Sequence, residues 1–190
     1  MTAKSITPAA LPLEAGRVRV RRLHVTDLAD FQTYRTDPKL ARYQGWEVSD
    51  DASALAFLES MALSTGFCVG EWLQLGIATR EDRLIGDIGI GWHGASTAEL
   101  GYTLHSGYHG QGLACEAVDA VMTWLARQHH IRRVIAATDA RNTPSVRLLQ
   151  RLNFSLVGRR SMGETTAYHS VPTDKKAHAG DELVWQKMRI

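Results

Sequence analysis

The chain has 190 residues, of which 44% are hydrophobic, and 22 basic against 20 acidic side chains give it a formal charge of +2. This size and composition predict a single domain, residues 1–190, with one buried core. The near-neutral charge argues against nucleic acid as a partner, and no apolar run reaches the roughly 20 residues of a membrane span. Cys68 and Cys115 match no metal or redox spacing. We therefore expect reduced thiols, no metal and a cytoplasmic location.

The first part of the chain predicts one strand followed by two helices. The segment RVRVRRL, residues 17–23, alternates like a strand whose charged side chains face solvent. Thr26 and Asp27 provide caps for a helix along residues 28–34. Pro38 and Gly45 interrupt the pattern, and a second helix is expected to begin at residues 49–51.

The middle of the chain predicts an antiparallel meander. Two apolar runs, residues 72–80 and 83–93, are joined by a polar turn, and residues 98–105 form a third run. Three glycines spell G-x-G-x-x-G, a pattern found in dinucleotide-binding loops: Gly89, Gly91 and Gly94. That fingerprint requires a strand that leads into a helix, whereas these glycines lead from one strand into another. We interpret them as glycines of a twisted hairpin.

The last part of the chain predicts strand–helix units. Apolar residues at helical spacing follow residues 112–114, and RRVIAAT, residues 132–138, is typical of a buried strand. Asn142 or Thr143 can cap the next helix, with Pro144 in its first turn. Asn153 can end that helix, and strands are expected at residues 154–158 and 182–188. Between these two strands, residues 158–180 are polar and suggest a long variable loop.

The stretch YHGQGLACEA, residues 108–117, has the context of an anion site. A strand ends before it and a helix begins within it, so the positive end of the helix dipole lies at the turn. Gly110 and Gly112 let the backbone approach a ligand and turn N–H groups inward. Such a loop can bind a pyrophosphate without a lysine, although an ordinary glycine-rich turn has the same sequence character.

A second strand-to-helix junction follows, and the two junctions together resemble a known family. ELGYTLHSGYHGQGLACEAV followed by IAATDARNTPSVRLLQRLNFSLVG is similar to the acyl-CoA-binding half of the GNAT superfamily of N-acetyltransferases over residues 98–158. The nearest branch is the RimJ/RimL type, which acetylates ribosomal-protein N-termini and related small amines. The resemblance implies an α/β (α+β) fold with a mixed, mostly antiparallel sheet of about seven strands and about four helices. It also implies that one splayed pair of strands holds acyl-CoA.

The resemblance further implies where acetyl-CoA binds as co-substrate. The loop pattern of the family falls on His109, Gly112 and Ala114, with His109 departing from the usual Gln or Arg. The implied ligand contacts on the splayed strand, the loop and the following helices are Tyr102, Thr103, Leu104, His109, Gly110, Gln111, Gly112, Leu113, Ala114, Asn142 and Ser145. Asn142 is implied to bond the pantetheine arm, which is compatible with its role as a helix cap.

Transfer to an amine requires a neutral nucleophile, and two side chains are candidates for the base. The resemblance favours Glu99 at the start of the third meander strand, and His105 at its end is the alternative because imidazole titrates near neutral pH. Ser145 could present its hydroxyl to the leaving sulfur, since the family's alternative tyrosine is absent from the helix. A backbone N–H near Leu104 would hold the developing oxyanion.

The acceptor is expected to be a peptide N-terminus or a small-molecule amine. Its site would include Tyr43 and Trp46 in the aromatic connection, together with the 158–180 loop. The expected reaction is direct attack in a ternary complex, without membrane or nucleic acid, and a homodimer is left open. Two alternatives remain: a non-catalytic acyl-CoA-binding regulatory module, and an acyltransferase for an antibiotic amine.

Overall fold

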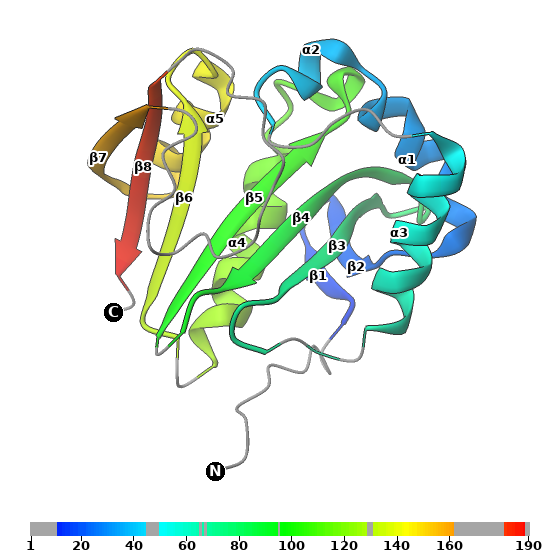
Figure 1. The fold of residues 1–190 in the computed structure, drawn as a ribbon, viewed down its shortest axis with the longest axis horizontal. Coiled ribbons are helices and arrows are strands. Elements are labelled where there is room, and N and C mark those ends of the chain that lie inside the picture. The colour runs from blue at the N-terminus through cyan, green and yellow to red at the C-terminus, as the bar shows by residue number, and fades with distance from the viewer. Residues whose placement is uncertain are drawn as a thin grey trace.

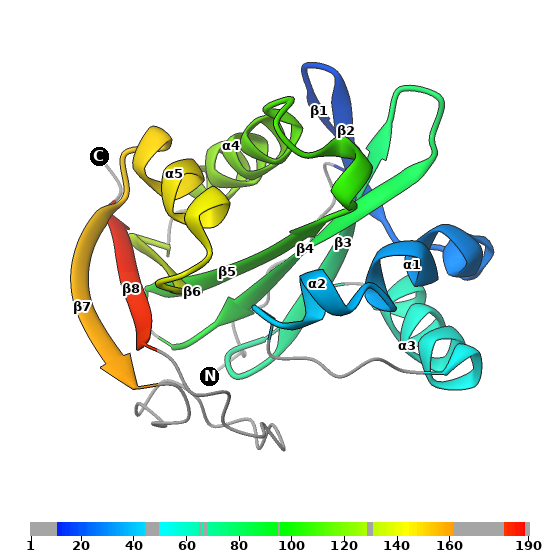
Figure 2. The same cartoon turned by 90° about the horizontal axis from the view of Figure 1, so that it is seen from above.

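One mixed sheet with helices on both faces forms the protein (Figures 1 and 2). The computed structural model describes residues 11–44, 50–64, 66, 68–94, 96–128, 131–161 and 181–188. The strands are β1 (Leu13–Ala15), β2 (Val18–Arg22), β3 (Trp72–Thr79), β4 (Leu84–Trp92), β5 (Thr97–Leu104), β6 (Arg133–Asp139), β7 (Ser155–Ser161) and β8 (Asp181–Met188). The helices are α1 (Leu28–Arg35), α2 (Pro38–Ala41), α3 (Asp51–Leu63), α4 (Leu113–Ala126) and α5 (Thr143–Arg151), with 3₁₀ turns η1 (Val25–Asp27) and η2 (Ser106–Tyr108).

The strand order is β1-β2-β3-β4-β5-β6-β8-β7, and only the β5–β6 pair is parallel. Helices α4 and α5 cover one face of the sheet, and α1, α2 and α3 lie on the other (Figure 2). The expected fold class and meander are confirmed, with eight strands and five α-helices in the part of the chain described. In the same ranges, no helix has both the length and the apolar character that crossing a bilayer requires.

The sequence-based prediction missed two short elements. Strand β1 precedes the first strand that the sequence predicts, and it pairs with β2 through three residues. Helix α2 lies where Pro38 was expected to interrupt the pattern. Pro38 instead begins the helix, because Asp37 accepts a hydrogen bond from the Lys39 N–H at 2.9 Å and proline suits the first helical position. Strand β7 also runs to Ser161, beyond the expected boundary at residue 158.

The main core lies between the sheet and α4, whose buried residues follow the expected helical stripe through Ala117, Val118, Val121 and Leu125. A smaller apolar cluster packs α1 and α3 against the opposite face. Asn153 ends the α5 segment with φ +58°, as its sequence position predicted. The sheet is therefore held from both sides, which fixes the strand ends where the site forms.

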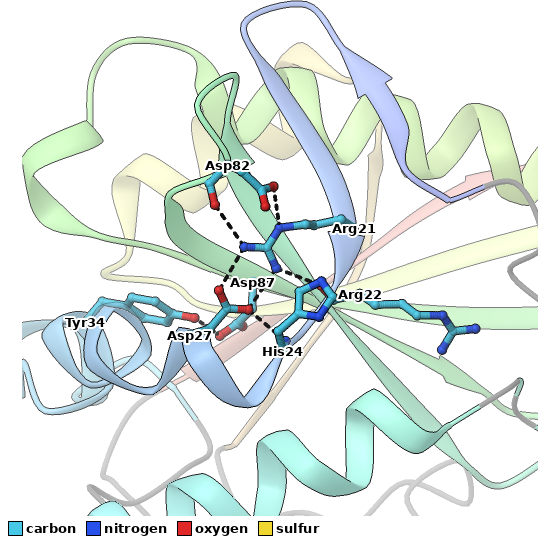
Figure 3. Close-up of polar contacts among 7 residues, drawn as sticks. All are labelled: Arg21, Arg22, His24, Asp27, Tyr34, Asp82 and Asp87. Carbon is cyan, nitrogen blue, oxygen red and sulfur yellow. Dashed lines mark hydrogen bonds and ion pairs between the residues drawn. The ribbon is translucent and has the colours of Figure 1, made fainter.

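Arg21 corrects the expectation that the charged residues of β2 face solvent. It is only 6% exposed, and its five guanidinium N–H groups are all used (Figure 3). It donates twice to Asp27 at 2.8 and 2.9 Å, to Asp82 Oδ1 at 2.8 Å, and to the carbonyls of Arg22 and Asp82. Asp27 also accepts from the His24 N–H at 2.8 Å. The ion pairs join β2, η1 and the β3–β4 turn.

A second buried carboxylate, Asp87, joins α1 to the centre of the sheet (Figure 3 shows its contact with Tyr34). Its Oδ2 accepts from the Tyr34 hydroxyl at 2.8 Å and from Arg35 Nη2 at 2.8 Å. Its Oδ1 accepts from Gln74 Nε2 at 2.6 Å. Burial, together with the negative charge of Asp87, raises the pKa of Tyr34 well above its ordinary value, so the phenol stays a donor.

The glycines of the G-x-G-x-x-G segment make room for an aromatic ring. A Cβ on Gly91 would lie 2.6 Å from Trp72 Cε2, and one on Gly89 would lie 3.3 Å from the same indole. Gly94 has φ +71° in the β4–β5 connection. The indole therefore lies against β4, and the hairpin interpretation of these glycines is confirmed.

Candidate active site

Strands β5 and β6 pair only over their first halves. Their register runs from Thr97 opposite Arg133 to Leu100 opposite Ala136, and beyond it the two strands diverge (Figure 1). We call the region between residues 101–104 of β5 and 137–139 of β6 the fork. The splayed pair expected from the sequence is therefore present, at the ends of the strands that carry the expected site residues.

The edge of β5 that faces the fork carries the backbone groups of Tyr102 and Leu104. Gln44 Nε2 donates to the Tyr102 carbonyl at 3.2 Å, and His109 Nε2 donates to the Leu104 carbonyl at 2.7 Å. Because the N–H and C=O of one strand residue point to the same side, the N–H groups of Tyr102 and Leu104 also lie on this edge. Thr103 points its backbone the other way, toward β4, where its register partner is Asp87.

The loop from β5 into α4 has the geometry of an anion site. Gly110 and Gly112 have φ +74° and +82°, left-handed conformations that cost other residues about 1–2 kcal/mol. Gly112 is the N-cap of α4, so the unpaired N–H groups of the first turn, from Leu113 onward, face the loop. The expected loop residues Gly110, Gln111, Gly112, Leu113 and Ala114 are thus brought together. His109 anchors this loop to β5 through its side chain.

The turn between β1 and β2 holds the same loop from outside. Arg17 Nη2 donates to the Gln111 carbonyl at 2.7 Å, and Arg17 Nε donates to Glu116 Oε1 at 2.9 Å. The Arg17 N–H donates to Glu116 Oε2 at 2.8 Å. These bonds lower the pKa of Glu116. Arg17 therefore neutralises the negative charge of Glu116, which would otherwise repel an anion from the first turn of α4.

The junction from β6 to α5 lies on the other side of the fork. Asp139, buried at the end of β6, accepts from Arg141 Nη2 at 2.6 Å and from the Arg141 N–H at 2.8 Å. Asn142 then caps α5 by accepting from the Ser145 N–H at 3.3 Å, which confirms its capping role. Because Oδ1 serves the cap and the side-chain amide is planar, the cap also fixes the orientation of the two N–H donors of Asn142.

Ser145 meets a side chain that the sequence did not connect with it. The Tyr102 hydroxyl lies 2.8 Å from Ser145 Oγ, joining β5 to α5. Burial raises the pKa of Tyr102 to about 12, against a smaller lowering by Ser145. Tyr102 is therefore a neutral phenol at physiological pH.

Glu99 lies near the start of β5, and its side chain is buried. It is 6% exposed, and its Oε2 lies 2.7 Å from His93 Nε2. Trp72 and Glu99 both lie opposite Gly91 in the strand registers, on either side of it. His93 also lies edge-on to the Trp72 ring, with centroids 6.0 Å apart. No motif marked His93, because its proximity to Glu99 depends on the β4–β5 register.

His105 lies away from Glu99, about 20 Å along β5 at the strand rise of about 3.4 Å per residue. Its Nδ1 accepts from the Gly107 N–H at 3.0 Å, and its ring packs edge-on to Tyr108. The two candidate bases are thus at opposite ends of the strand. Tyr43 lies at the end of the α2 segment with Arg42 over its ring at 4.8 Å, whereas Trp46 lies outside the described residues.

The profile of the acetyltransferase (GNAT) domain matches residues 17–155. The chain therefore belongs to the GNAT family of acetyltransferases, as the sequence motifs indicated. The uncharacterized N-acetyltransferase p20 of Bacillus licheniformis is 26% identical over 153 residues, which cover 77% of this chain and 83% of that protein.

Solved structures share the fold. A GNAT-family acetyltransferase from Bacillus anthracis superposes with a TM-score of 0.77 at 19% identity, covering 94% of this chain and 99% of that chain. RimL, a ribosomal L7/L12 alpha-N-protein acetyltransferase solved with coenzyme A, superposes with a TM-score of 0.75 at 17% identity, covering 93% and 97%. The GNAT family, which residues 98–158 indicated, is thus confirmed, and the fold is shared with RimL.

Proposed function

We propose that this protein transfers an acetyl group from acetyl-CoA to a primary amine by direct attack in a ternary complex. The observation that carries the proposal is the fork, which has an anion-binding helix terminus on one side and the capped start of α5 on the other. Acetyl-CoA supplies a thioester, whose carbonyl carbon is open to an amine and whose thiolate can leave. The acceptor is a peptide N-terminus or a small-molecule amine.

The residues of the fork fit the parts of this co-substrate. The loop backbone of residues 110–114 offers N–H groups to a pyrophosphate. The strand edge at Tyr102 and Leu104 offers N–H groups to amide and acyl oxygens, and Asn142 at the start of α5 has a side-chain amide with two further donors. In this arrangement the Leu104 N–H stabilises the negative charge that develops on the acyl oxygen.

One side chain is assigned to the proton of the amine and another to the leaving sulfur. Glu99 accepts the proton of the attacking amine, directly or through water, and its contact with His93 provides a route for passing the proton on. Ser145 presents its hydroxyl to the departing sulfur from the first turn of α5. His105 is less suited to the first role because its Nδ1 already accepts a backbone bond in η2.

Release of free CoA thiol from acetyl-CoA tests this proposal, measured with amino-terminal peptides, amino acids, polyamines and aminoglycosides as acceptors. Glu99→Gln is expected to lower kcat about 10²-fold or more, as for a proton-transfer group. Ser145→Ala is expected to lower kcat about 10- to 10²-fold, as for loss of one hydrogen bond to a charged sulfur. Glu59→Gln and Ser155→Ala, both exposed and remote from the fork, are matched controls. Clear acetyl-CoA binding without transfer to any amine would refute catalysis and favour a regulatory acyl-CoA-binding module.

We also propose a cytoplasmic location, which the two free cysteines, Cys68 and Cys115, support because reducing compartments preserve thiols. Burial raises the pKa of Cys115, so this thiol is not an activated nucleophile. Direct attack is therefore favoured over a covalent acetyl-enzyme. Loss of activity in Cys115→Ala with CoA binding retained would contradict that preference.

A further inference from the structure

The Tyr102–Ser145 contact joins the two sides of the fork. Tyr102 lies on β5 two residues beyond its last pairing with β6, and Ser145 lies on the first turn of α5. Their hydroxyl oxygens are 2.8 Å apart, and the phenol lies 3.4 Å from the Ser145 carbonyl. Both hydrogen bonds of this phenol within the described residues therefore go to a single serine.

Packing accounts for the Tyr102 ring but not for its hydroxyl. The ring packs against the main core. A phenylalanine would fill the same space, and burying a hydroxyl is unfavourable unless it gains a partner. The partner that it gains is the side chain assigned to the leaving sulfur. The Ser145 N–H is held by Asn142 Oδ1 at the same time, so Ser145 is fixed from two directions.

Protonation and geometry together suit the phenol to be the donor: it has one proton, and Ser145 Oγ at 2.8 Å is nearer to it than the Ser145 carbonyl at 3.4 Å. Because burial raises the pKa of Tyr102 to about 12, the phenol keeps its proton across the working pH range. A neutral phenol that donates to Ser145 Oγ leaves the serine proton free to point elsewhere. A hydroxyl that accepts one hydrogen bond also becomes a stronger donor in the next, because bonds in a chain polarise one another.

We propose that Tyr102 is a positioning residue for the acyl transfer: its hydroxyl donates to Ser145 Oγ and directs the serine O–H toward the departing sulfur. The inference rests on the proposed function and deepens it. The amine nitrogen bonds to the acyl carbon, its proton passes to Glu99, and the C–S bond breaks with its electron pair on sulfur. The Tyr102–Ser145 chain stabilises that thiolate by hydrogen bonding, and the thiolate then takes a proton from solvent.

The direction of proton flow follows from the relative acidities. A thiol has a pKa of about 8.5, well below the value of the Tyr102 phenol. A proton transfer from the phenol to the thiolate would therefore be uphill, and the two hydroxyl protons stay on oxygen. The contribution of Tyr102 is confined to the orientation and donor strength of Ser145. It should disappear when the serine hydroxyl is absent.

A double-mutant cycle tests the inference. The cycle compares wild type, Tyr102→Phe, Ser145→Ala and the double variant in kcat, in KM for acetyl-CoA and in Kd for CoA by calorimetry. Tyr102→Phe is expected to lower kcat about tenfold, as for loss of one hydrogen bond of typical net strength, and to leave Kd within about twofold. In the Ser145→Ala background, the same substitution should change kcat less than about twofold. Tyr34→Phe, which removes a buried phenol of α1 that donates to Asp87 outside the fork, is the matched control.

The outcomes separate the inference from the function beneath it. If Tyr102→Phe lowers kcat by the same factor in the wild-type and Ser145→Ala backgrounds, the proposal is overturned. It is also overturned if Tyr102→Phe raises Kd for CoA by as much as it lowers kcat and lowers the melting temperature, because the tyrosine is then structural. Full activity of Ser145→Ala in an active enzyme would overturn the role of the pair and leave acetyl transfer standing. Absence of turnover in wild type with every amine would overturn the proposed function itself, and this inference with it.

Discussion

Asp87→Asn should destabilise the protein far more than a change of one atom suggests. The carboxylate accepts from Tyr34, Arg35 and Gln74, so each oxygen faces donors only. An asparagine must turn its NH₂ group toward one of those donors in either orientation. Arg35, whose side chain is 12% exposed, would also lose its counter-charge. Breaking a buried pair in this way costs about 3–5 kcal/mol, a large part of the usual 5–15 kcal/mol of stability.

Urea unfolding, followed by tryptophan fluorescence and circular dichroism, measures this loss as a shift in midpoint at constant slope. For a domain of this size the melting temperature should fall by about 10 °C. Asp82→Asn is the control, because Asp82 also contacts a buried arginine but is 56% exposed in its side chain. Arg21 keeps both bonds to Asp27 in that variant. Its cost should stay below about 1 kcal/mol.

A loss below about 1 kcal/mol for Asp87→Asn, equal to that of Asp82→Asn, would refute the reasoning. It would mean that water or a rearranged Arg35 replaces the lost acceptor. Tyr34→Phe provides an intermediate point, since it removes one of several donors to the same carboxylate and leaves the charge in place. Its expected cost is about 1–3 kcal/mol.

Two further predictions concern the loop and the β6 end. Arg17→Met should raise KM for acetyl-CoA about fivefold with little change in kcat, because it exposes the loop to the charge of Glu116. Adding Glu116→Gln should restore KM, and high salt should reduce the rise in KM. An unchanged KM in Arg17→Met would show that Arg17 does not affect acetyl-CoA binding through the charge of Glu116. Because Arg141 lowers the pKa of Asp139, that pair stabilises the fold above about pH 4 and the stabilisation fades as the pH falls through the lower folded-state pKa. The difference in unfolding free energy between wild type and Asp139→Asn should therefore be constant near neutrality and vanish in acid; a gap that widens in acid would reverse the sign.

The order of strands and long helices could be predicted from the sequence because those signals are local. Periodicity over a dozen residues marks α4, and alternation marks β2 and the meander. Strand β1 and helix α2 are three and four residues long, too short for either period to emerge. The solvated interpretation of Arg21 was wrong because alternation shows which residues share a face, and not whether loops such as the β3–β4 turn cover that face.

In the candidate site, too, locally determined features could be predicted and contacts between distant segments could not. The glycines of the loop, the Asn142 cap and the first turn of α5 are set by nearby residues, so sequence alone located them. The partners of the candidate catalytic side chains come from distant segments, such as Tyr102 for Ser145. Gln44 likewise contacts Tyr102 on the β5 edge, 58 residues away in sequence, because of where the α2 segment lies. These pairings follow from register and helix placement, which no short motif encodes.

The fork gives the protein a strand edge in the middle of its own sheet. Bare edges recruit strands from other molecules, which is why most sheets shorten, charge or cover them. In this chain the side chains of Gln44 and His109 hold the carbonyls of Tyr102 and Leu104, and the Tyr102–Ser145 bond spans the fork from β5 to α5. These side chains therefore occupy hydrogen-bonding groups and space that a strand from another molecule would need in order to pair with this edge.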